Sequence, residues 1–154
     1  MRIVTLAMFV KGDEILLAMK KRGFGTGNWN GYGGKLAEGE SVEDAAVREI
    51  YEESGTVVRK EDLEHLGTLD FYFIDKPEWD QCGMIYRVQK WEGEPVESEE
   101  MKPQWFKKDA MPYEHMWKGD DEWFPYFLEG VKFSGEIHFA EGGKKVVAIK
   151  IQKE

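Results

Sequence analysis

The sequence has little of the chemistry that cross-links a chain. It contains one cysteine, Cys82, among 154 residues, so an internal disulfide is excluded and a reducing compartment is expected. The three histidines, His65, His115 and His138, are scattered, and no Cys/His spacing is typical of a zinc site. Stability must therefore come from an apolar core, for which the 42% of hydrophobic residues provide the material.

Positive charge is also scarce. Lysine and arginine number 21 against 30 aspartates and glutamates, for a formal net charge of −9. Such a balance argues against a nucleic-acid polymer as partner, because polymer binding normally needs a basic face. It does not exclude a nucleotide, since a bound metal ion can reverse the local field.

Long hydrophobic runs and repeats are missing. Residues 1–10 are apolar but too short to span a membrane, and they lack a signal-peptide cleavage pattern. We expect a soluble, cytoplasmic, monomeric protein whose residues 1–154 form a single domain. No low-complexity tract or linker interrupts the chain.

Strand and helix patterns alternate along the sequence. Strands are predicted at residues 4–10, 14–19, 63–73, 84–88, 105–106, 136–140 and 145–151, several of them joined as hairpins. A turn of helix is predicted within residues 109–117, and an amphipathic helix over 122–129 despite Pro125. Helices separated by strands indicate an α/β or α+β sandwich with a mixed β-sheet.

The stretch GKLAEGESVEDAAVREIYEESGT, residues 34–56, is the most informative. Ser41 is a good N-cap, with Asp44 three residues on as in a capping box, and Gly55 suits the left-handed residue that ends a helix. Gly33 and Gly34 precede the helix in a loop that can approach a ligand closely, because no Cβ intervenes.

Three carboxylates share one face of this predicted helix. Glu49, Glu52 and Glu53 are spaced i, i+3 and i+4, and three like charges so close together destabilise the helix unless a cation lies among them. Hard divalent ions such as Mg²⁺ take oxygen ligands and leave room for substrate phosphates. The pattern indicates a half-built metal site that a phosphorylated substrate completes, although a solvated acidic helix gives the same composition.

The spacing around these glutamates resembles the Nudix box, G-x5-E-x7-R-E-U-x-E-E-x-G-U, in which U is apolar. It matches from Gly34 through Glu40 and Arg48 to Gly55, and departs only at Thr56, which replaces an apolar residue. The resemblance implies an α/β fold, the Nudix α/β/α sandwich with a mixed β-sheet.

Segments outside the box are similar to the MutT-type oxidised purine nucleoside triphosphatases of that family. They are residues 19–25, 29–35, 95–98, 100–101, 105–106, 116–117 and 123–125. The resemblance implies that the protein is an enzyme hydrolysing nucleoside triphosphates such as 8-oxo-dGTP to monophosphate and pyrophosphate. It implies Mg²⁺ as cofactor, with Mn²⁺ as an alternative ion.

The resemblance also assigns residues. The metal ligands would be Glu49, Glu52, Glu53, Glu100 and the Gly33 carbonyl, with Arg48 completing the catalytic set. The base would be recognised by Thr5, Asn30, Phe71, Trp117, Asp120 and Trp123, with Phe24 at the pocket edge and Lys20 near the phosphates. From the residues alone, Glu100 is one of three acids in 97–100 that could complete a metal site or belong to an ordinary acidic loop.

Three questions stay open at this stage. The triplet Lys20-Lys21-Arg22 is either a solvated strand end or a docking point for phosphates. Mammalian members of the MutT-type group have two adjacent aspartates, two and three residues after the tryptophan that matches Trp117. At these positions this chain has Gly119 and Asp120. One base-reading carboxylate is lost unless a one-residue slip brings in Asp121. The substrate could be another nucleoside diphosphate-linked compound, or the protein a non-catalytic nucleotide binder.

Overall fold

A computed structural model describes residues 1–23 and 25–154; Phe24, expected at the pocket edge, lies outside the described residues. The strands in chain order are β1 (Arg2–Lys11), β2 (Glu14–Lys20), β3 (Trp29–Asn30), β4 (Leu63–Phe73), β5 (Gln81–Val88), β6 (Met101–Lys107), β7 (Phe133–Ala140) and β8 (Lys145–Lys153). The α-helices are α1 (Val42–Ser54) and α2 (Asp120–Leu128). Short 3₁₀ turns cover Lys60–Asp62, Pro77–Trp79, Tyr113–His115 and Glu141–Gly143.

The strands form a mixed sheet in the order β3-β2-β1-β5-β4-β7-β8, with β6 also paired to β2. The pairs β1–β5 and β4–β7 are parallel, and the hairpins β1–β2, β4–β5 and β7–β8 are antiparallel. β2 pairs with β1 only over residues 14–16, and then with β3 through Ala18 and Met19. β2 therefore diverges from β1 beyond Leu16.

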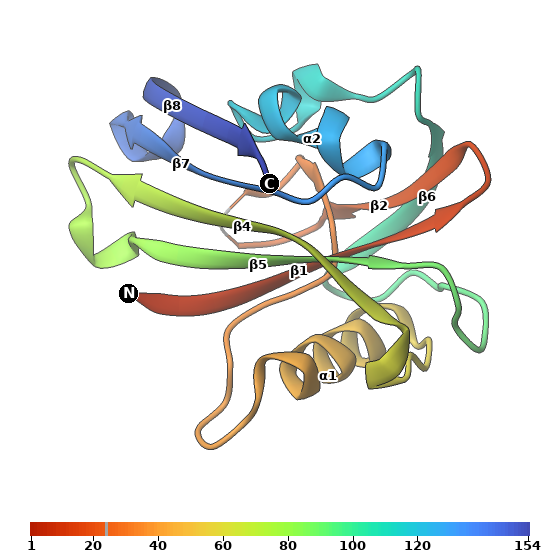
Figure 1. The fold of residues 1–154 in the computed structure, drawn as a ribbon. Coiled ribbons are helices and arrows are strands. Elements are labelled where there is room, and N and C mark those ends of the chain that lie inside the picture. Colours follow the sequence, from red (N-terminus) through yellow and green to blue (C-terminus); the bar gives the residue numbers. More distant parts are fainter. Residues whose placement is uncertain (24) are drawn as a thin grey trace.

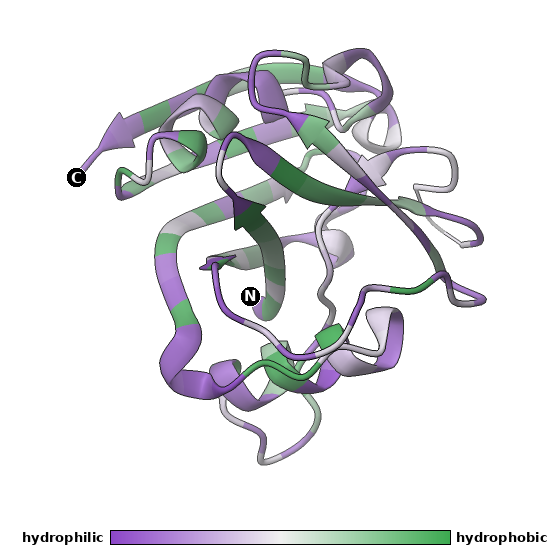
Figure 2. Ribbon diagram, turned by 90° about the vertical axis from the view of Figure 1, so that its right-hand side faces the viewer, coloured by the Kyte–Doolittle hydropathy of each residue, from purple (hydrophilic) through white to green (hydrophobic). Residues whose placement is uncertain are grey.

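The two helices cover opposite faces of the sheet (Figure 1). Successive β1 residues alternate between two apolar clusters: Met8 packs in the cluster that contains Phe124 of α2, and Phe9 in the one that contains Ile50 of α1. The interior strands are accordingly the most strongly hydrophobic part of the ribbon in Figure 2, while the loops at its rim are more polar. This three-layer arrangement confirms the predicted α/β sandwich with a mixed sheet.

Helix α1 has the ends that its sequence predicts. The Ser41 side chain accepts a hydrogen bond from the Asp44 backbone N–H, 3.1 Å away, and Gly55 ends the helix at φ +78°. Ala46 and Ile50, four residues apart, are both buried and so share the helix face that packs on the sheet. The Ser41 cap fixes the residue at which the helix begins, and with it the direction in which the glutamates project.

Several predicted boundaries differ, those of β6, β5 and α2 among them. β6 runs over seven residues rather than only 105–106, and Trp105 and Phe106 are half-buried rather than buried. Pro103 lies inside it, which is tolerated because β6 pairs with β2 alone among the described strands and so lies at an edge. β5 starts at Gln81 instead of residue 84, and α2 starts at Asp120 instead of residue 122. Within the described residues, no helix is long and apolar enough to cross a membrane.

Candidate active site

A cavity of about 510 Å³ opens among β1, β4, β5, α2 and the loop after β3, a size suited to a small ligand. It brings together most of the residues predicted to bind substrate. Two predicted metal ligands also line it: Glu53 of α1, and Gly33 of the loop 31–35, here called the glycine loop. The predicted residues that line it are Thr5, Lys20, Asn30, Gly33, Glu53, Phe71, Trp117, Asp120 and Trp123. Arg48, Glu49, Glu52 and Glu100 are not among the lining residues.

Asp120 is the polar group of the α2 side of the cavity. Its side chain is almost wholly buried, at 5% exposure, and its Oδ1 accepts a hydrogen bond from the Trp123 indole N–H at 3.1 Å. Burial raises the pKa of Asp120 to about 8, against the opposing effect of the hydrogen bond from Trp123. The carboxyl is therefore largely protonated at neutral pH and can donate a hydrogen bond into the cavity.

The neighbouring Asp121 does not reach this cavity. It is exposed and borders a separate shallow hollow with Lys118 and Lys144. Of the two aspartates that the sequence left in question, only Asp120 lines the main cavity.

The two tryptophans have different surroundings. Trp123 is 1% exposed and stacks on Phe124 and Phe133, with ring centroids 4.0 and 5.6 Å away. Its indole therefore has a fixed position from which it donates to Asp120. Trp117 lies edge-on to Phe139 at 6.2 Å. A Cβ at Gly143 would come within 2.6 Å of the Trp117 ring. Glycine at this position therefore lets the backbone of residue 143 pack directly against Trp117.

The polar residues on the β1 side are held by local hydrogen bonds. The Thr5 hydroxyl lies 3.4 Å from the Gly34 carbonyl and 3.3 Å from the Gly34 amide. Asn30 Oδ1 accepts a hydrogen bond from the Gly31 amide at 2.9 Å. Thr5 therefore ties β1 to the glycine loop, and Asn30 keeps a fixed orientation at the cavity.

Sequence reasoning missed several lining residues. Phe73, Trp79, Gln81 and Phe139 belong to this group. Phe73 shares the period-two face of Phe71 on β4, so the alternation alone could have found it. Gln81 and Phe139 reach the cavity through the parallel pairings β1–β5 and β4–β7, for which the sequence has no local signal.

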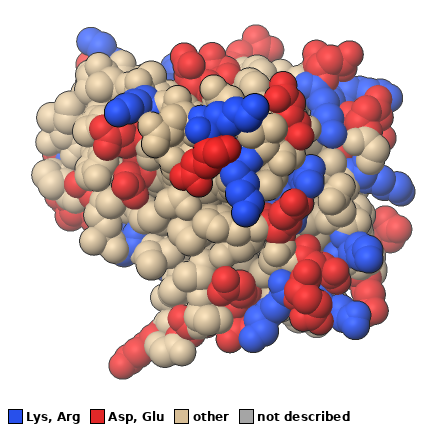
Figure 3. Space-filling model, viewed as in Figure 1, with Lys and Arg blue, Asp and Glu red and all other residues tan. Residues whose placement is uncertain are grey.

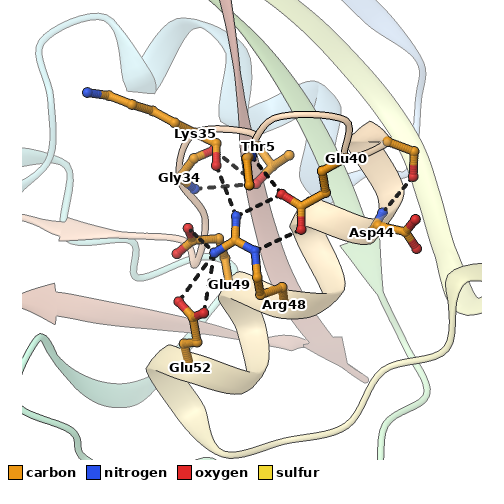
Figure 4. Close-up of polar contacts among 10 residues, drawn as sticks. Thr5, Gly34, Lys35, Glu40, Asp44, Arg48, Glu49 and Glu52 are labelled. Carbon is orange, nitrogen blue, oxygen red and sulfur yellow. Dashed lines mark hydrogen bonds and ion pairs between the residues drawn. The ribbon is translucent and has the colours of Figure 1, made fainter.

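Arg48 organises the outer surface of α1 (Figure 4). Its guanidinium binds both oxygens of Glu40, at 2.8 and 2.9 Å, and the Lys35 carbonyl at 3.1 Å. It also binds Glu49 at 2.9 Å and Glu52 at 3.3 Å. The bond to Arg48 lowers the pKa of Glu40 to about 2. Arg48 thus fastens the loop before α1 to the helix and orients two of the three glutamates predicted to bind metal.

Glu53 is the carboxylate that faces the cavity. Its Oε1 accepts a hydrogen bond from the Gly33 amide at 2.9 Å. Burial raises the pKa of Glu53 to about 8, and the charges of Glu49 and Glu100 add to the rise, while the Gly33 amide and Lys20 oppose it. A buried acid with like charges around it is a place where a cation would be strongly stabilised.

The glycine loop is closely fitted to these acids. A Cβ at Gly34 would lie 2.7 Å from Glu49 Oε1, so only glycine leaves this carboxylate in place. Beneath the loop, Tyr32 is fully buried, and among the described residues its hydroxyl has no hydrogen-bond partner. Burial, followed by the charge of Glu53, raises the pKa of Tyr32, so it stays a neutral phenol.

The predicted metal ligands are oxygens of the kind that Mg²⁺ and Mn²⁺ prefer, but they are not gathered into one cluster. In the described part of the chain no three acidic, histidine or cysteine side chains lie close enough together to hold an ion. Glu49 and Glu52 turn to Arg48, Glu53 to Gly33, and Glu100 to Arg22. The three glutamates thus share one face of α1, but Glu49 and Glu52 accept from Arg48 whereas Glu53 accepts from the Gly33 amide.

The fold and this carboxylate helix define the class of protein. A family model described as the NUDIX domain matches residues 1–127, and the helix that bears the glutamates lies within that range. The chain belongs to the Nudix family.

Two curated relatives resemble nearly the whole chain. The oxidized purine nucleoside triphosphate hydrolase of Danio rerio is 43% identical over 152 residues, covering 99% of this chain and 95% of that protein. Its counterpart in Mus musculus is 44% identical over 140 residues, covering 91% and 88%. Among solved structures, a mutator MutT protein from Bacillus halodurans matches with a TM-score of 0.85 at 27% identity, over 99% of this chain and 98% of that one.

Proposed function

We propose that this Nudix hydrolase, which acts on phosphoric anhydrides, converts oxidised purine nucleoside triphosphates such as 8-oxo-dGTP to the monophosphate and pyrophosphate. Such a reaction removes damaged nucleotides from the precursor pool. The observation that carries the proposal is one cavity that joins an aromatic, base-sized end near Trp117 and Asp120 to Glu53 on the Nudix helix. The names of the two vertebrate relatives support the same substrate class.

A divalent ion fits the donors at the Glu53 end. Its ligands would come from Glu49, Glu52, Glu53, Glu100 and the Gly33 carbonyl, and we propose Mg²⁺, with Mn²⁺ able to replace it. The supporting observation is that Glu53 is buried beside the charges of Glu49 and Glu100: burial chiefly raises its pKa, these two charges add to the rise, and a cation there would stabilise the ionised carboxylate. When bound, the ion neutralises phosphate oxygens and the charge that develops on them.

The protein's own groups supply positioning and charge. Displacement at phosphorus needs an aligned water and neutralised oxygens rather than a covalent nucleophile. Lys20 lines the cavity and lowers the pKa of both Glu53 and Glu100, so its ammonium group is near enough to attract the phosphates. Glu53 and Glu100 are the carboxylates that can orient water and accept its proton.

The aromatic end has the chemistry to select a purine. Trp117, Phe71 and Phe139 provide flat apolar surfaces for a base. The protonated Asp120 offers a donor, and Asn30 offers an amide, to polar atoms on the rim. With one carboxyl instead of two at this end, the preferred damaged base is set by fewer contacts than the mammalian pattern provides.

The test of the catalytic assignment is a pair of isosteric variants. Glu53→Gln and Glu52→Gln should each lower kcat by about 10²-fold or more, because each removes a charge that balances the cation, while circular dichroism shows an unchanged fold. Glu61→Gln, in the exposed turn Lys60–Asp62, is the matched control and should keep full activity. Wild-type rates in both Glu52→Gln and Glu53→Gln would refute the site.

The test of the base pocket is Trp117→Ala. Losing a stacking surface should raise the KM for purine nucleotides by about tenfold, since base–aromatic stacking contributes roughly 1–3 kcal/mol. The substrates to compare are 8-oxo-dGTP, 2-hydroxy-dATP, methylated purine nucleotides and dGTP, together with nucleotide sugars and dinucleoside polyphosphates. An unchanged KM would remove Trp117 from the pocket, and faster hydrolysis of the diphosphate-linked compounds would replace the proposed substrate. Binding without turnover in Mg²⁺ would indicate a nucleotide sensor.

We further propose that the protein works as a cytoplasmic monomer on a free nucleotide rather than on a nucleic-acid polymer or a membrane. On the face drawn in Figure 3, basic side chains are interspersed with acidic ones instead of forming one basic area, and the net charge is −9. Sedimentation at micromolar concentration and a binding assay with single-stranded DNA test this; a stable dimer or tight DNA binding would contradict it.

A further inference from the structure

The basic triplet at the end of β2 lies against the turn that carries Glu100. β2 and β6 pair up to Lys20 opposite Met101, and one residue further the Lys21 backbone N–H donates to the Glu100 carbonyl at 2.8 Å. The triplet and residues 97–101, here called the Glu100 turn, are therefore neighbours because of strand register.

Lys21 holds the beginning of the Glu100 turn. Its Nζ is 2.6 Å from Glu97 Oε2 and 2.8 Å from the Ser98 carbonyl. Ser98 in turn closes the turn from within, because its Oγ accepts hydrogen bonds from the amides of Glu100 and Met101 at 3.3 and 3.1 Å. Fixing Glu97 and Ser98 therefore fixes where residue 100 emerges.

Arg22 holds the other end. Its Nε and Nη2 both donate to Glu100 Oε1, at 3.0 and 2.6 Å, and Nη2 lies 3.5 Å from Glu99. Both bonds to Glu100 use the same oxygen, so no bond from Arg22 engages Oε2. The contact can orient this carboxylate without occupying all of its ligand positions.

The Glu100 turn is close to the site on α1. Met101 lines the main cavity, and the charge of Glu100 acts on Glu53. A single exposed ion pair contributes little to stability, and these pairs are partly exposed, at 37% for Lys21 and 61% for Arg22. Lys21 and Arg22 nevertheless make several contacts to the Glu100 turn, which carries the proposed metal ligand Glu100. We infer that these contacts orient Glu100 rather than stabilise the whole fold.

We propose that Lys21 and Arg22 are positioning residues that hold the Glu100 turn, and with it the Glu100 carboxylate, beside the Glu53 end of the cavity. This rests on the proposed function, because orientation of Glu100 matters only where Glu100 acts. Binding a turn of their own chain is a third role for Lys21 and Arg22, beside the solvated strand end and the phosphate dock that the sequence allowed for the triplet.

The first experiment compares Lys21→Met and Lys21→Arg. Lys21→Met should lower kcat by about tenfold, as loss of a supporting contact around a ligand typically does, and leave the KM for the nucleotide unchanged because the aromatic end is untouched. Lys21→Arg, which can still reach Glu97, should restore most of the rate. Lys107→Met is the matched control, since Lys107 makes a similar ion pair with Asp13, at 3.2 Å, at the opposite end of the β2–β6 pair; it should behave as wild type.

A second measurement does not depend on turnover. Titration calorimetry with Mn²⁺ on the nucleotide-free protein should show about tenfold weaker binding in Lys21→Met than in Lys107→Met. Hydrogen exchange at the Glu100 and Met101 amides should speed up in Lys21→Met alone, while Tm changes little. Wild-type Mn²⁺ affinity and kcat in Lys21→Met would overturn the proposal.

A double variant separates this proposal from the function on which it rests. If Lys21 acts through Glu100, Lys21→Met should add no further loss of kcat in a Glu100→Gln background. The same tenfold loss in both backgrounds would show that Lys21 acts elsewhere, for example on phosphate, and would overturn the positioning role. Full activity of Glu100→Gln would instead remove Glu100 from the proposed mechanism, whatever Lys21→Met does.

Discussion

Asp120 shows how one buried residue changes the chemistry of a pocket. An aspartate in water is ionised at neutral pH, but burial behind Trp123 raises the pKa of this one to about 8. Glu53, at the other end of the cavity, has its pKa raised to about 8 chiefly by the same cause. Two protonatable acids therefore border one cavity, one where a base would lie and one where phosphates would lie.

These two acids should make stability depend on pH. In the unfolded chain both carboxyls have a pKa of about 4, so between about pH 4 and 8 folding takes up protons. Their stabilising contribution is complete below about pH 4 and is lost as the pH rises through 8, at up to about 1.4 kcal/mol per pH unit for each group. Asp120→Asn should reduce this slope, because the amide cannot titrate.

Urea unfolding at several pH values between about 5 and 8 checks this prediction. The wild type should lose stability with rising pH more steeply than Asp120→Asn, and Asp121→Asn, at the exposed neighbour, is the control that should keep the wild-type slope. Parallel curves for wild type and Asp120→Asn would show that Asp120 is ionised in the folded protein.

At the scale of elements, α1 depends on its caps. The helix carries glutamates that repel one another, and the hydrogen bond from the Asp44 amide to Ser41 offsets part of that repulsion. Ser41→Ala should lower the free energy of unfolding by about 1 kcal/mol. Ser41→Asp keeps an acceptor and should stay near the wild type in urea unfolding. Equal stability of Ser41→Ala and wild type would contradict the role of the cap.

The sequence alone predicts those parts of the fold that depend on residues close together in the chain. The caps of α1 and the hairpins β1–β2 and β7–β8 follow from residues within a few positions of each other. The length of β6 does not: Lys102, Pro103 and Gln104 lack a strand pattern, and pairing with β2, more than eighty positions earlier, makes them a strand. The early start of β5 likewise follows from its parallel pairing with β1.

The candidate site likewise contains residues that the sequence predicts and residues that it does not. The residues carried over from the family pattern, such as Glu53, Asn30 and Asp120, do meet in one cavity. Missed were Gln81 and Phe139, which strand pairing brings in, and the arginine partners of the glutamates. A spacing pattern shows which side chains share a helix face, but the direction of each carboxylate depends on donors such as Arg22 that come from another part of the chain.

On the scale of the whole molecule, the sheet is a partition with a helix on each side (Figure 1). The cavity nevertheless receives Glu53 from α1 and Asp120 from α2, on opposite faces. It can do so where β2 leaves β1 beyond Leu16 and the loop 31–35 runs beside β1, through the bridges of Ala7 with Tyr32 and of Val4 with Lys35. The loop 31–35, whose glycines line the cavity, is thus where one ligand can contact residues of both layers.

The acidic balance of the molecule leads to a last prediction, which concerns metal ions. An ion that binds only the folded protein stabilises it by mass action, by about 2.7 kcal/mol at a hundred times its Kd, so Mg²⁺ should raise Tm by several degrees. Part of any rise could come from screening of the net charge of −9, and NaCl at matched ionic strength measures that part. Glu53→Gln should lose the excess of Mg²⁺ over NaCl, whereas Glu61→Gln should keep it. Equal shifts in Mg²⁺ and NaCl for the wild type would mean that the acids only share a diffuse ion atmosphere.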